Sequence, residues 1–203
     1  MPRNRHYPSI DALPASLPVF PLRGCVLLPR TSMPLNIFEP RYLVMLDAVI
    51  AGNRLLGIVQ PDHSVPGVES PEGRSVPLRK VGSLGRLTAF QEQSDGRYLI
   101  TLRGVSRFEI ASELDTTTPY RICAVDHARF AADLDDDQSE ATIDRATLID
   151  ALKRSFAARS LSVEWSGISS MSSEDLVNAL SVAGPYSPEE KQALLEARDA
   201  SAR

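Results

Sequence analysis

The sequence predicts an α+β protein in which a strand-rich part is followed by a helical part. Before residue 131, short apolar stretches alternate with proline, glycine and Asp-Gly turns, and after residue 140 apolar residues recur every three or four positions. Many short strands linked by turns are typical of a barrel or folded sheet and not of βαβ units. We therefore expect a barrel or folded sheet with a helical tail.

The strand-like stretches are apolar or alternating, and they comprise residues 19–22, 25–28, 33–38, 54–60, 84–93, 97–102, 105–111 and 120–129. Asp95 and Gly96 lie between two of these stretches, and this dipeptide predicts a hairpin turn because both residue types tolerate positive φ. Gly104 predicts a bulge or tight bend between two further stretches.

One helix is expected to interrupt the strands. Pro40 suits a first helical position, where its missing N–H costs nothing, and Glu39 places negative charge near the positive end of the helix dipole. The apolar residues that fall on one face of this helix are Leu43, Leu46, Val49 and Ile50. Gly52 predicts its end.

The C-terminal part is expected to contain three helices. Apolar residues repeat along residues 143–156, Ser172 begins a second helix that Gly184 ends, and Ser187 with Glu190 predicts an N-cap for a third. We expect the third helix to continue to the last residues. Trp165 is expected to anchor the helix that follows it to the core.

Composition and charge divide the chain into two parts. Residues 1–130 carry a net charge of +3 and residues 131–203 carry −7, within an overall −4. We predict an irregular lead-in over residues 1–16, a β-rich domain over 17–131, an acidic linker over 132–140 and a helical subdomain over 141–203. Residues 61–75 have the composition of a long loop.

The motifs of several enzyme classes are absent from the sequence. Lys80, Lys153 and Lys191 are the only lysines and none follows glycine, which excludes a Walker A motif. The chain lacks a Gly-x-Ser-x-Gly elbow, a GxGxxG motif and an HExxH motif, and its three histidines occur singly. We predict no catalytic residue, no cofactor and no metal site.

The expected location is the cytoplasm. The N-terminus lacks the positive-then-apolar pattern of a signal peptide, and no apolar run approaches the roughly 20 residues of a membrane helix. Cys25 and Cys123 lack the spacing of a metal motif, and we expect them to be reduced and buried.

Several stretches in order resemble the Lon protease N-terminal domain, in the form found in stand-alone Lon-N-like proteins. They are the stretch LPVFPLRGCVLLPRTSMPLNIFEPRYLVML at residues 17–46, VGSLGR at 81–86, DGRYLI at 95–100, GVSRF at 104–108, PYR at 119–121 and EEKQALLE at 189–196. The resemblance implies a PUA-like pseudo β-barrel of about six strands with one inserted helix, followed by a C-terminal helical bundle. It also implies a non-catalytic module that holds protein substrates.

Aromatic and arginine residues near strand ends are the candidate binding residues, because these types dominate peptide-binding hot spots. They are Phe38, Arg41, Tyr42, Arg86, Arg107, Phe108 and Tyr120. An exposed strand edge could add main-chain hydrogen bonds to an extended peptide. The structural alternative places Phe38, Tyr42 and Phe108 in the core and pairs Arg41 with Glu39.

Three functions remain open from the sequence. The first is binding of peptide or unfolded-protein segments. The second is binding of nucleic acid or a small ligand through the barrel; the basic balance of residues 1–130 favours it and the overall acidic charge opposes it. The third is an adaptor or regulatory role on a separate protease or assembly.

Overall fold

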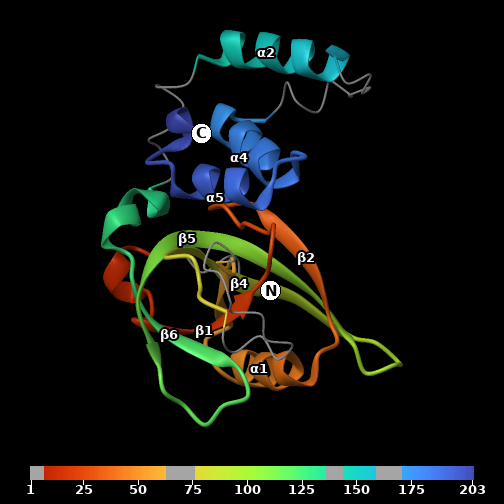
Figure 1. The fold of residues 1–203 in the computed structure, drawn as a ribbon, viewed down its shortest axis with the longest axis vertical. Coiled ribbons are helices and arrows are strands. Elements are labelled where there is room, and N and C mark those ends of the chain that lie inside the picture. The colour runs from red at the N-terminus through yellow and green to blue at the C-terminus, as the bar shows by residue number, and fades with distance from the viewer. Residues whose placement is uncertain (1–6, 63–75, 136–143, 159–170) are drawn as a thin grey trace.

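A ring of paired strands encloses the core of the N-terminal part (Figure 1). The computed structural model describes residues 7–62, 76–135, 144–158 and 171–203. The strands form one six-stranded mixed sheet, and they are β1 (Ser16–Pro21), β2 (Ser32–Ile37), β3 (Leu55–Val59), β4 (Val81–Glu92), β5 (Tyr98–Leu114) and β6 (Arg121–Asp126). The strand order is β2-β5-β4-β3-β1-β6.

The long strand β5 closes the ring. One edge of β5 pairs with β4, while its other edge pairs first with β2 and then with β6. Because β6 also pairs with β1, strands β1, β3, β4, β5 and β6 form a closed circuit. Strand β2 lies outside this circuit. Within the described residues it pairs with one strand, β5.

The predicted turn and bulge are confirmed. Gly96 has φ +80° at the tip of the β4–β5 hairpin. The β4–β5 register shifts where Gly85 pairs with Gly104, so the two stretches predicted on either side of Gly104 form the single strand β5. At Gly104 the backbone of β5 also approaches the backbone at Leu28 closely, since an added Cβ would lie 2.0 Å from the Leu28 carbonyl oxygen.

Helix α1 (Pro40–Ala51) covers one opening of the ring, as Figure 1 shows. Pro40 occupies the first turn and Gly52 is the C-cap residue, as the sequence predicts. The buried residues of its inner face are Tyr42, Met45, Leu46 and Val49, and they pack into the main core cluster with Phe20, Leu56 and Ile100.

The strand expected over residues 25–28 is absent, which corrects that prediction. Val26, Leu27 and Leu28 are buried, but they form an irregular extended segment whose Leu27 N–H donates to the Ser83 hydroxyl over 3.3 Å. A side chain satisfies this backbone group in place of a neighbouring strand. A short apolar stretch is compatible with either a paired strand or an irregular buried segment, so the sequence alone does not distinguish the two.

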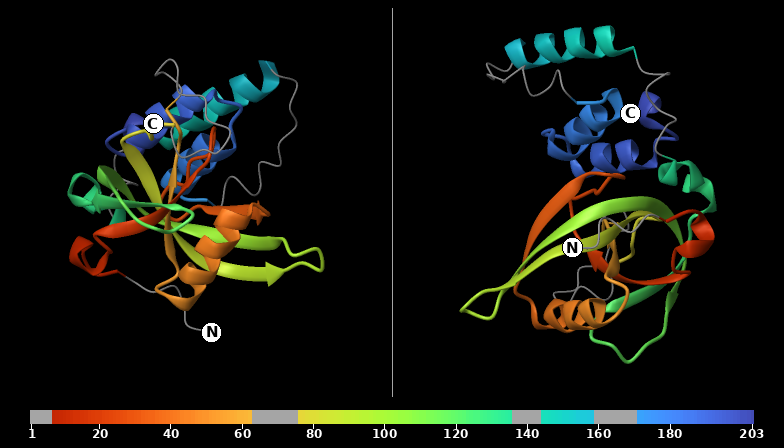
Figure 2. Two further views of the ribbon diagram at one scale, coloured as in Figure 1. Left: turned by 60° about the horizontal axis from the view of Figure 1, so that its bottom comes forward. Right: turned by 180° about the vertical axis from the view of Figure 1, so that it is seen from behind.

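The described residues of the C-terminal part form η2 (Ala128–Leu134), α2 (Arg145–Ala158), α4 (Ser173–Ala183), α5 (Pro188–Glu196) and η4 (Ala200–Ala202). Ser172 caps α4, and Ser187 and Glu190 form a capping box at the start of α5. Figures 1 and 2 show α4 and α5 stacked on the β5 side of the barrel, with α2 beyond them.

Two further predictions differ from the structure. Asp133, the first residue of the acidic run, lies within η2 and is 8% exposed, so it is not part of a solvated linker. Helix α5 ends at Glu196 and does not continue to the last residues. Most of the loop predicted over residues 61–75, and Trp165, lie outside the described residues.

Candidate functional site

The outer edge of β2 is a free strand edge within the described residues. β2 is the terminal strand in the sheet order, and Figures 1 and 2 show it at the margin of the barrel. Its exposed residues are Ser32, Pro34 and Asn36, while Met33 and Ile37 are buried. The alternation places the polar side chains on the outer face of the sheet and the apolar ones on the core.

Along an edge strand, the backbone N–H and C=O groups of alternate residues point toward the paired strand and away from it, and this alternation decides which groups the edge presents. The Gly104 N–H donates to the Thr31 carbonyl oxygen over 2.9 Å, and Ser32 lies opposite Arg103. In an antiparallel pair this bond makes Ser32–Arg103 a non-hydrogen-bonded pair. The backbone groups of Ser32, Pro34 and Asn36 therefore point outward, away from β5.

Pro34 limits what the edge can donate. Because proline lacks an N–H, the outward donors are those of Ser32 and Asn36, while all three outward residues offer a carbonyl oxygen. The placement is consistent with the preference of proline for edge strands, where no ladder bond is lost. We call Ser32, Pro34 and Asn36 the β2 outer edge.

Exposed apolar side chains lie beside this edge. Phe38 follows β2 directly and is 64% exposed. Leu99, which pairs with Asn36 across the sheet, is 44% exposed, and Phe90 on the same hairpin is 43% exposed. Phe90 packs edge-on against Tyr98 with 4.8 Å between ring centroids. The hairpin therefore presents apolar surface on both of its faces.

The other candidates near Phe38 are partly or wholly structural. Tyr42 is 5% exposed and its ring lies 4.2 Å from that of Phe20. Burial raises the pKa of the Tyr42 hydroxyl. Arg41 binds the Glu39 carboxylate over 2.8 Å and stacks on the Tyr42 ring, and Tyr120 packs at the edge of the same core. The structural alternative therefore holds for Tyr42 and Arg41, and it is wrong for the exposed Phe38.

Arg86 and Phe108 lie away from the β2 outer edge. The Arg86 Nη1 donates to the Tyr7 hydroxyl over 3.1 Å. Phe108 is fully buried, and its ring fills the space above two glycines that lack side chains, Gly57 and Gly82. The seven candidate residues therefore do not converge on one groove.

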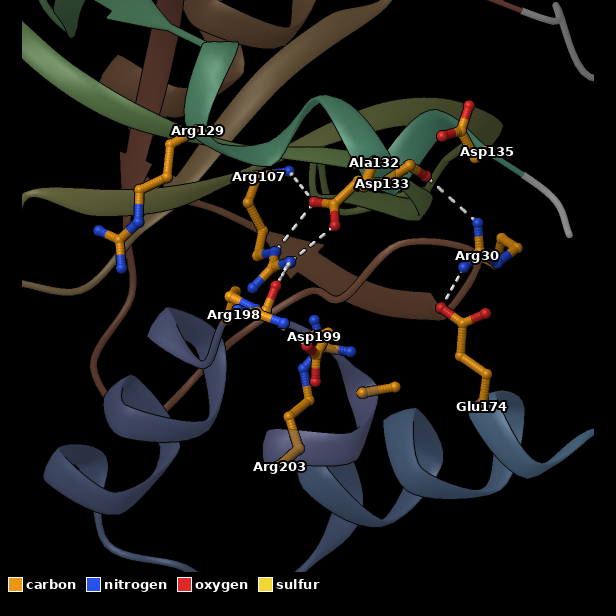
Figure 3. A pocket seen from close by; sticks show the side chains of 11 residues that line it. Arg30, Arg107, Arg129, Ala132, Asp133, Asp135, Glu174, Arg198, Asp199 and Arg203 are labelled. Atoms are coloured by element: carbon orange, nitrogen blue, oxygen red, sulfur yellow. Dashed lines mark hydrogen bonds and ion pairs between the residues drawn. The ribbon is translucent and has the colours of Figure 1, made fainter. Parts of the chain in front are cut away.

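Arg107 joins the barrel to the C-terminal part, as Figure 3 shows. Its Nε and Nη2 donate to the two carboxylate oxygens of Asp133 over 2.9 and 2.7 Å, and its side chain is 2% exposed. It also donates to the carbonyl oxygens of Leu195, Ala197 and Arg198. The guanidinium lies 4.2 Å from the centre of the Phe130 ring. Through these carbonyl contacts Arg107 holds the last turn of α5 and the segment that follows it.

A comparison with known families identifies the fold. The model of the ATP-dependent protease La (LON) substrate-binding domain matches residues 16–203. The chain belongs to this family. A Lon protease from Syntrophus aciditrophicus (strain SB) is 28% identical over 198 residues, which cover 94% of this chain and 24% of that protein. The chain thus spans about a quarter of the length of that curated relative, and 13% of Lon protease 2 from Sorangium cellulosum (strain So ce56).

Two solved structures share the fold of this LON substrate-binding domain. The Lon N-terminal domain protein from Xanthomonas campestris superposes with a TM-score of 0.61 at 21% identity, covering 91% of this chain and 92% of that one. The N-terminal domain of a Mycobacterium avium complex Lon protease gives a TM-score of 0.62 at 17% identity, with 92% coverage of both chains.

Sequence reasoning missed the β2 outer edge, Asp133 and the hairpin side chains Phe90 and Leu99. The alternation of residues 32–37 carried a signal for the edge, because it separates an outer face from an inner one. No sequence pattern indicates that β2 pairs with a single strand, since strand order is a property of the tertiary structure. Asp133 was hidden within a run of acidic residues of the same type.

The described part of this LON substrate-binding domain offers no group of three or more histidine, cysteine or acidic side chains able to hold a metal ion. Within the same ranges, no helix has the length and apolar character needed to cross a membrane. Burial raises the pKa of the Cys123 thiol to about 11, so this cysteine is a protonated, packed side chain near neutral pH.

Proposed function

We propose that this chain is a non-catalytic module that binds extended peptide or unfolded-protein segments through the β2 outer edge. Membership of a family described as a substrate-binding domain carries the proposal. An extended segment would add a strand beside β2, with its backbone groups bonded to the outward donors and acceptors of Ser32, Pro34 and Asn36.

The neighbouring side chains support the same mode of binding. Phe38, directly after β2, provides exposed apolar surface next to the incoming segment, and Leu99 adds apolar surface one strand farther in, opposite Asn36. Backbone bonding is independent of sequence, whereas the apolar contacts favour segments with hydrophobic residues. Unfolded proteins expose both an unpaired backbone and apolar side chains, so they match this edge.

The finer description of the module belongs to the same proposal. The closed circuit of β1, β3, β4, β5 and β6 supports a PUA-like barrel, and the contacts of α4 with α5 and η4 support a helical bundle. We place the chain in the cytoplasm, acting beside a protease or other assembly that processes what it holds.

The test compares an unfolded protein with its folded form. Reduced, carboxymethylated lactalbumin is the unfolded probe and native lactalbumin is the control, with binding measured by fluorescence anisotropy. Replacing Asn36 by proline removes an outward N–H and leaves the pairing with β5 intact, because that N–H does not face β5. We expect Asn36→Pro and Phe38→Ser each to weaken binding about tenfold, the factor that about 1.4 kcal/mol produces.

A matched control is Leu114→Ser. Leu114 is 39% exposed like the hairpin residues, but it lies at the far end of β5, opposite Ile122 of β6. We expect this variant to bind like the parent protein. Equal binding of folded and unfolded lactalbumin, or unchanged binding by Asn36→Pro and Phe38→Ser, would contradict the proposal.

A further inference from the structure

An arginine-rich pocket lies between the outer side of β5, η2, α4 and η4 (Figure 3). Its volume is about 360 Å³, which falls within the roughly 300–1,000 Å³ of small-molecule sites. Five arginines and four carboxylates line it, and the arginines are Arg30, Arg107, Arg129, Arg198 and Arg203. The β2 outer edge contributes no residue to this lining, so the pocket is a separate feature.

Most of the arginines already have a carboxylate partner. Arg107 pairs with Asp133, Arg30 with Glu174, Arg129 with Glu109 at 2.7 Å and Arg198 with Asp199 at 3.2 Å. Arg203 is the exception within the described residues, because its recorded hydrogen bond goes to the neutral Asn178 side chain over 2.6 Å. Its Nε is buried and has no hydrogen-bond partner.

The surroundings of Arg203 are unfavourable for an unpaired cation. Burial lowers its pKa to about 10, and the positive charges of Arg107 and Arg30 act in the same direction. Asp133 and Glu174 oppose this effect without cancelling it. A partly buried charge without a counter-charge is unfavourable, and an added anion would offset that cost.

We propose that this pocket binds a small molecule through one oxyanion group, a carboxylate or a phosphate, which pairs with Arg203. The planar guanidinium offers parallel N–H donors that match the oxygens of either group. A group with a single negative charge fits best, since Arg203 is the one lining arginine without a carboxylate pair within the described residues. Polyanions such as nucleic acid would be opposed by Asp135 and Asp199 at the same pocket.

The experiment measures thermal unfolding of the full chain with inorganic phosphate, with acetate and with sodium chloride at equal ionic strength. Phosphate or acetate is expected to raise Tm by about 2–5 °C beyond sodium chloride, with saturation. The identity of the stabilising anion distinguishes a phosphate from a carboxylate ligand. Arg203→Gln is expected to abolish the rise, and it should fold because it removes a buried charge without orphaning a carboxylate.

Two further variants keep the test decisive. Arg97→Gln alters an exposed arginine at the hairpin tip, paired with Asp95, and should keep the full rise. Arg129→Gln removes an arginine from the rim of the pocket, where its side chain is 49% exposed, and should raise the dissociation constant for the anion about threefold. No stabilisation beyond sodium chloride, or an equal rise in Arg203→Gln and the parent, would overturn the proposal.

Discussion

Arg107 of β5 and Asp133 of η2 form a bidentate ion pair that is almost wholly removed from solvent. Asp133 also accepts the backbone N–H of Arg107 over 2.8 Å, so one carboxylate receives three donors from a single residue. With its position set in this way, the Arg107 guanidinium reaches carbonyl oxygens in the last turn of α5 and just beyond it. The pair therefore connects three segments that are distant in sequence.

Replacing Asp133 by alanine should destabilise the protein strongly. The change leaves the Arg107 guanidinium buried without its counter-charge, and such losses typically cost about 3–5 kcal/mol. Urea unfolding followed by circular dichroism measures the effect. The exposed Asp95–Arg97 pair gives the comparison, and Arg97→Ala, which breaks this pair without changing a turn residue, should leave the urea midpoint unchanged within error.

A double variant separates the unpaired charge from the lost contacts. Arg107→Met combined with Asp133→Leu removes both charges and retains apolar volume, so it should be more stable than Asp133→Ala alone. If the double variant were the less stable of the two, the bonds from Arg107 to the C-terminal carbonyls would outweigh the burial of charge.

Replacing Gly82 by alanine should also destabilise the barrel, through overpacking. An added Cβ would lie 2.7 Å from the Phe108 ring and 2.8 Å from the Val59 side chain. Forcing extra atoms into a packed core typically costs about 1–3 kcal/mol. Thermal unfolding measures the change. Adding Phe108→Leu should recover part of the loss, because the ring is the obstacle, whereas an additive effect of the two changes would show that the ring is not responsible.

Local features of the fold were predictable from the sequence. The Asp95–Gly96 turn, the Pro40 start of α1 and the Ser187 cap of α5 depend on the conformational preferences of a few adjacent residues. The end of α5 was not predictable, because no local stop signal marks it, and Arg107, which binds a carbonyl oxygen of its last turn, lies 88 residues away. The irregular segment over residues 25–28 likewise depends on Ser83, which no local pattern reveals.

The candidate site was predictable only in residue type. Aromatic and arginine residues were predicted as candidate binding residues, but side-chain direction within β5 divides them: Phe108 enters the core and Arg107 faces η2. Exposure of Phe38 follows from its position just beyond β2, where the strand has already left the core. Strand order had to be known before the β2 outer edge could be recognised.

Replacing Ser187 by alanine should loosen α5. The Ser187 hydroxyl accepts from the Glu190 N–H over 3.1 Å, and the Glu190 carboxylate accepts from the Ser187 N–H over 2.7 Å. Loss of such a cap costs about 1 kcal/mol. Amide hydrogen exchange should show faster exchange in α5 with little change in β4 and β5. Ser94→Ala in the exposed hairpin turn is the control and should leave exchange in α5 unchanged. A local role for the cap would be contradicted if Ser94→Ala accelerated exchange in α5 equally, or if Ser187→Ala accelerated exchange throughout the barrel.

Cys123 should make the protein less stable at alkaline pH. Burial raises the pKa of its thiol from 9.0 to about 11, so the folded state favours the protonated form. The stabilising contribution is therefore complete below pH 9 and is lost as the pH rises through 11, by about 2–3 kcal/mol in all. Urea unfolding under reducing conditions at pH 8 and pH 11 measures the free energy of unfolding. The Cys123→Ala variant is the reference, because tyrosine and lysine residues also titrate in this range and affect both proteins alike. The stability advantage of the parent over this variant should shrink at pH 11, and a difference that stays constant between the two pH values would show that the thiolate is not disfavoured in the core.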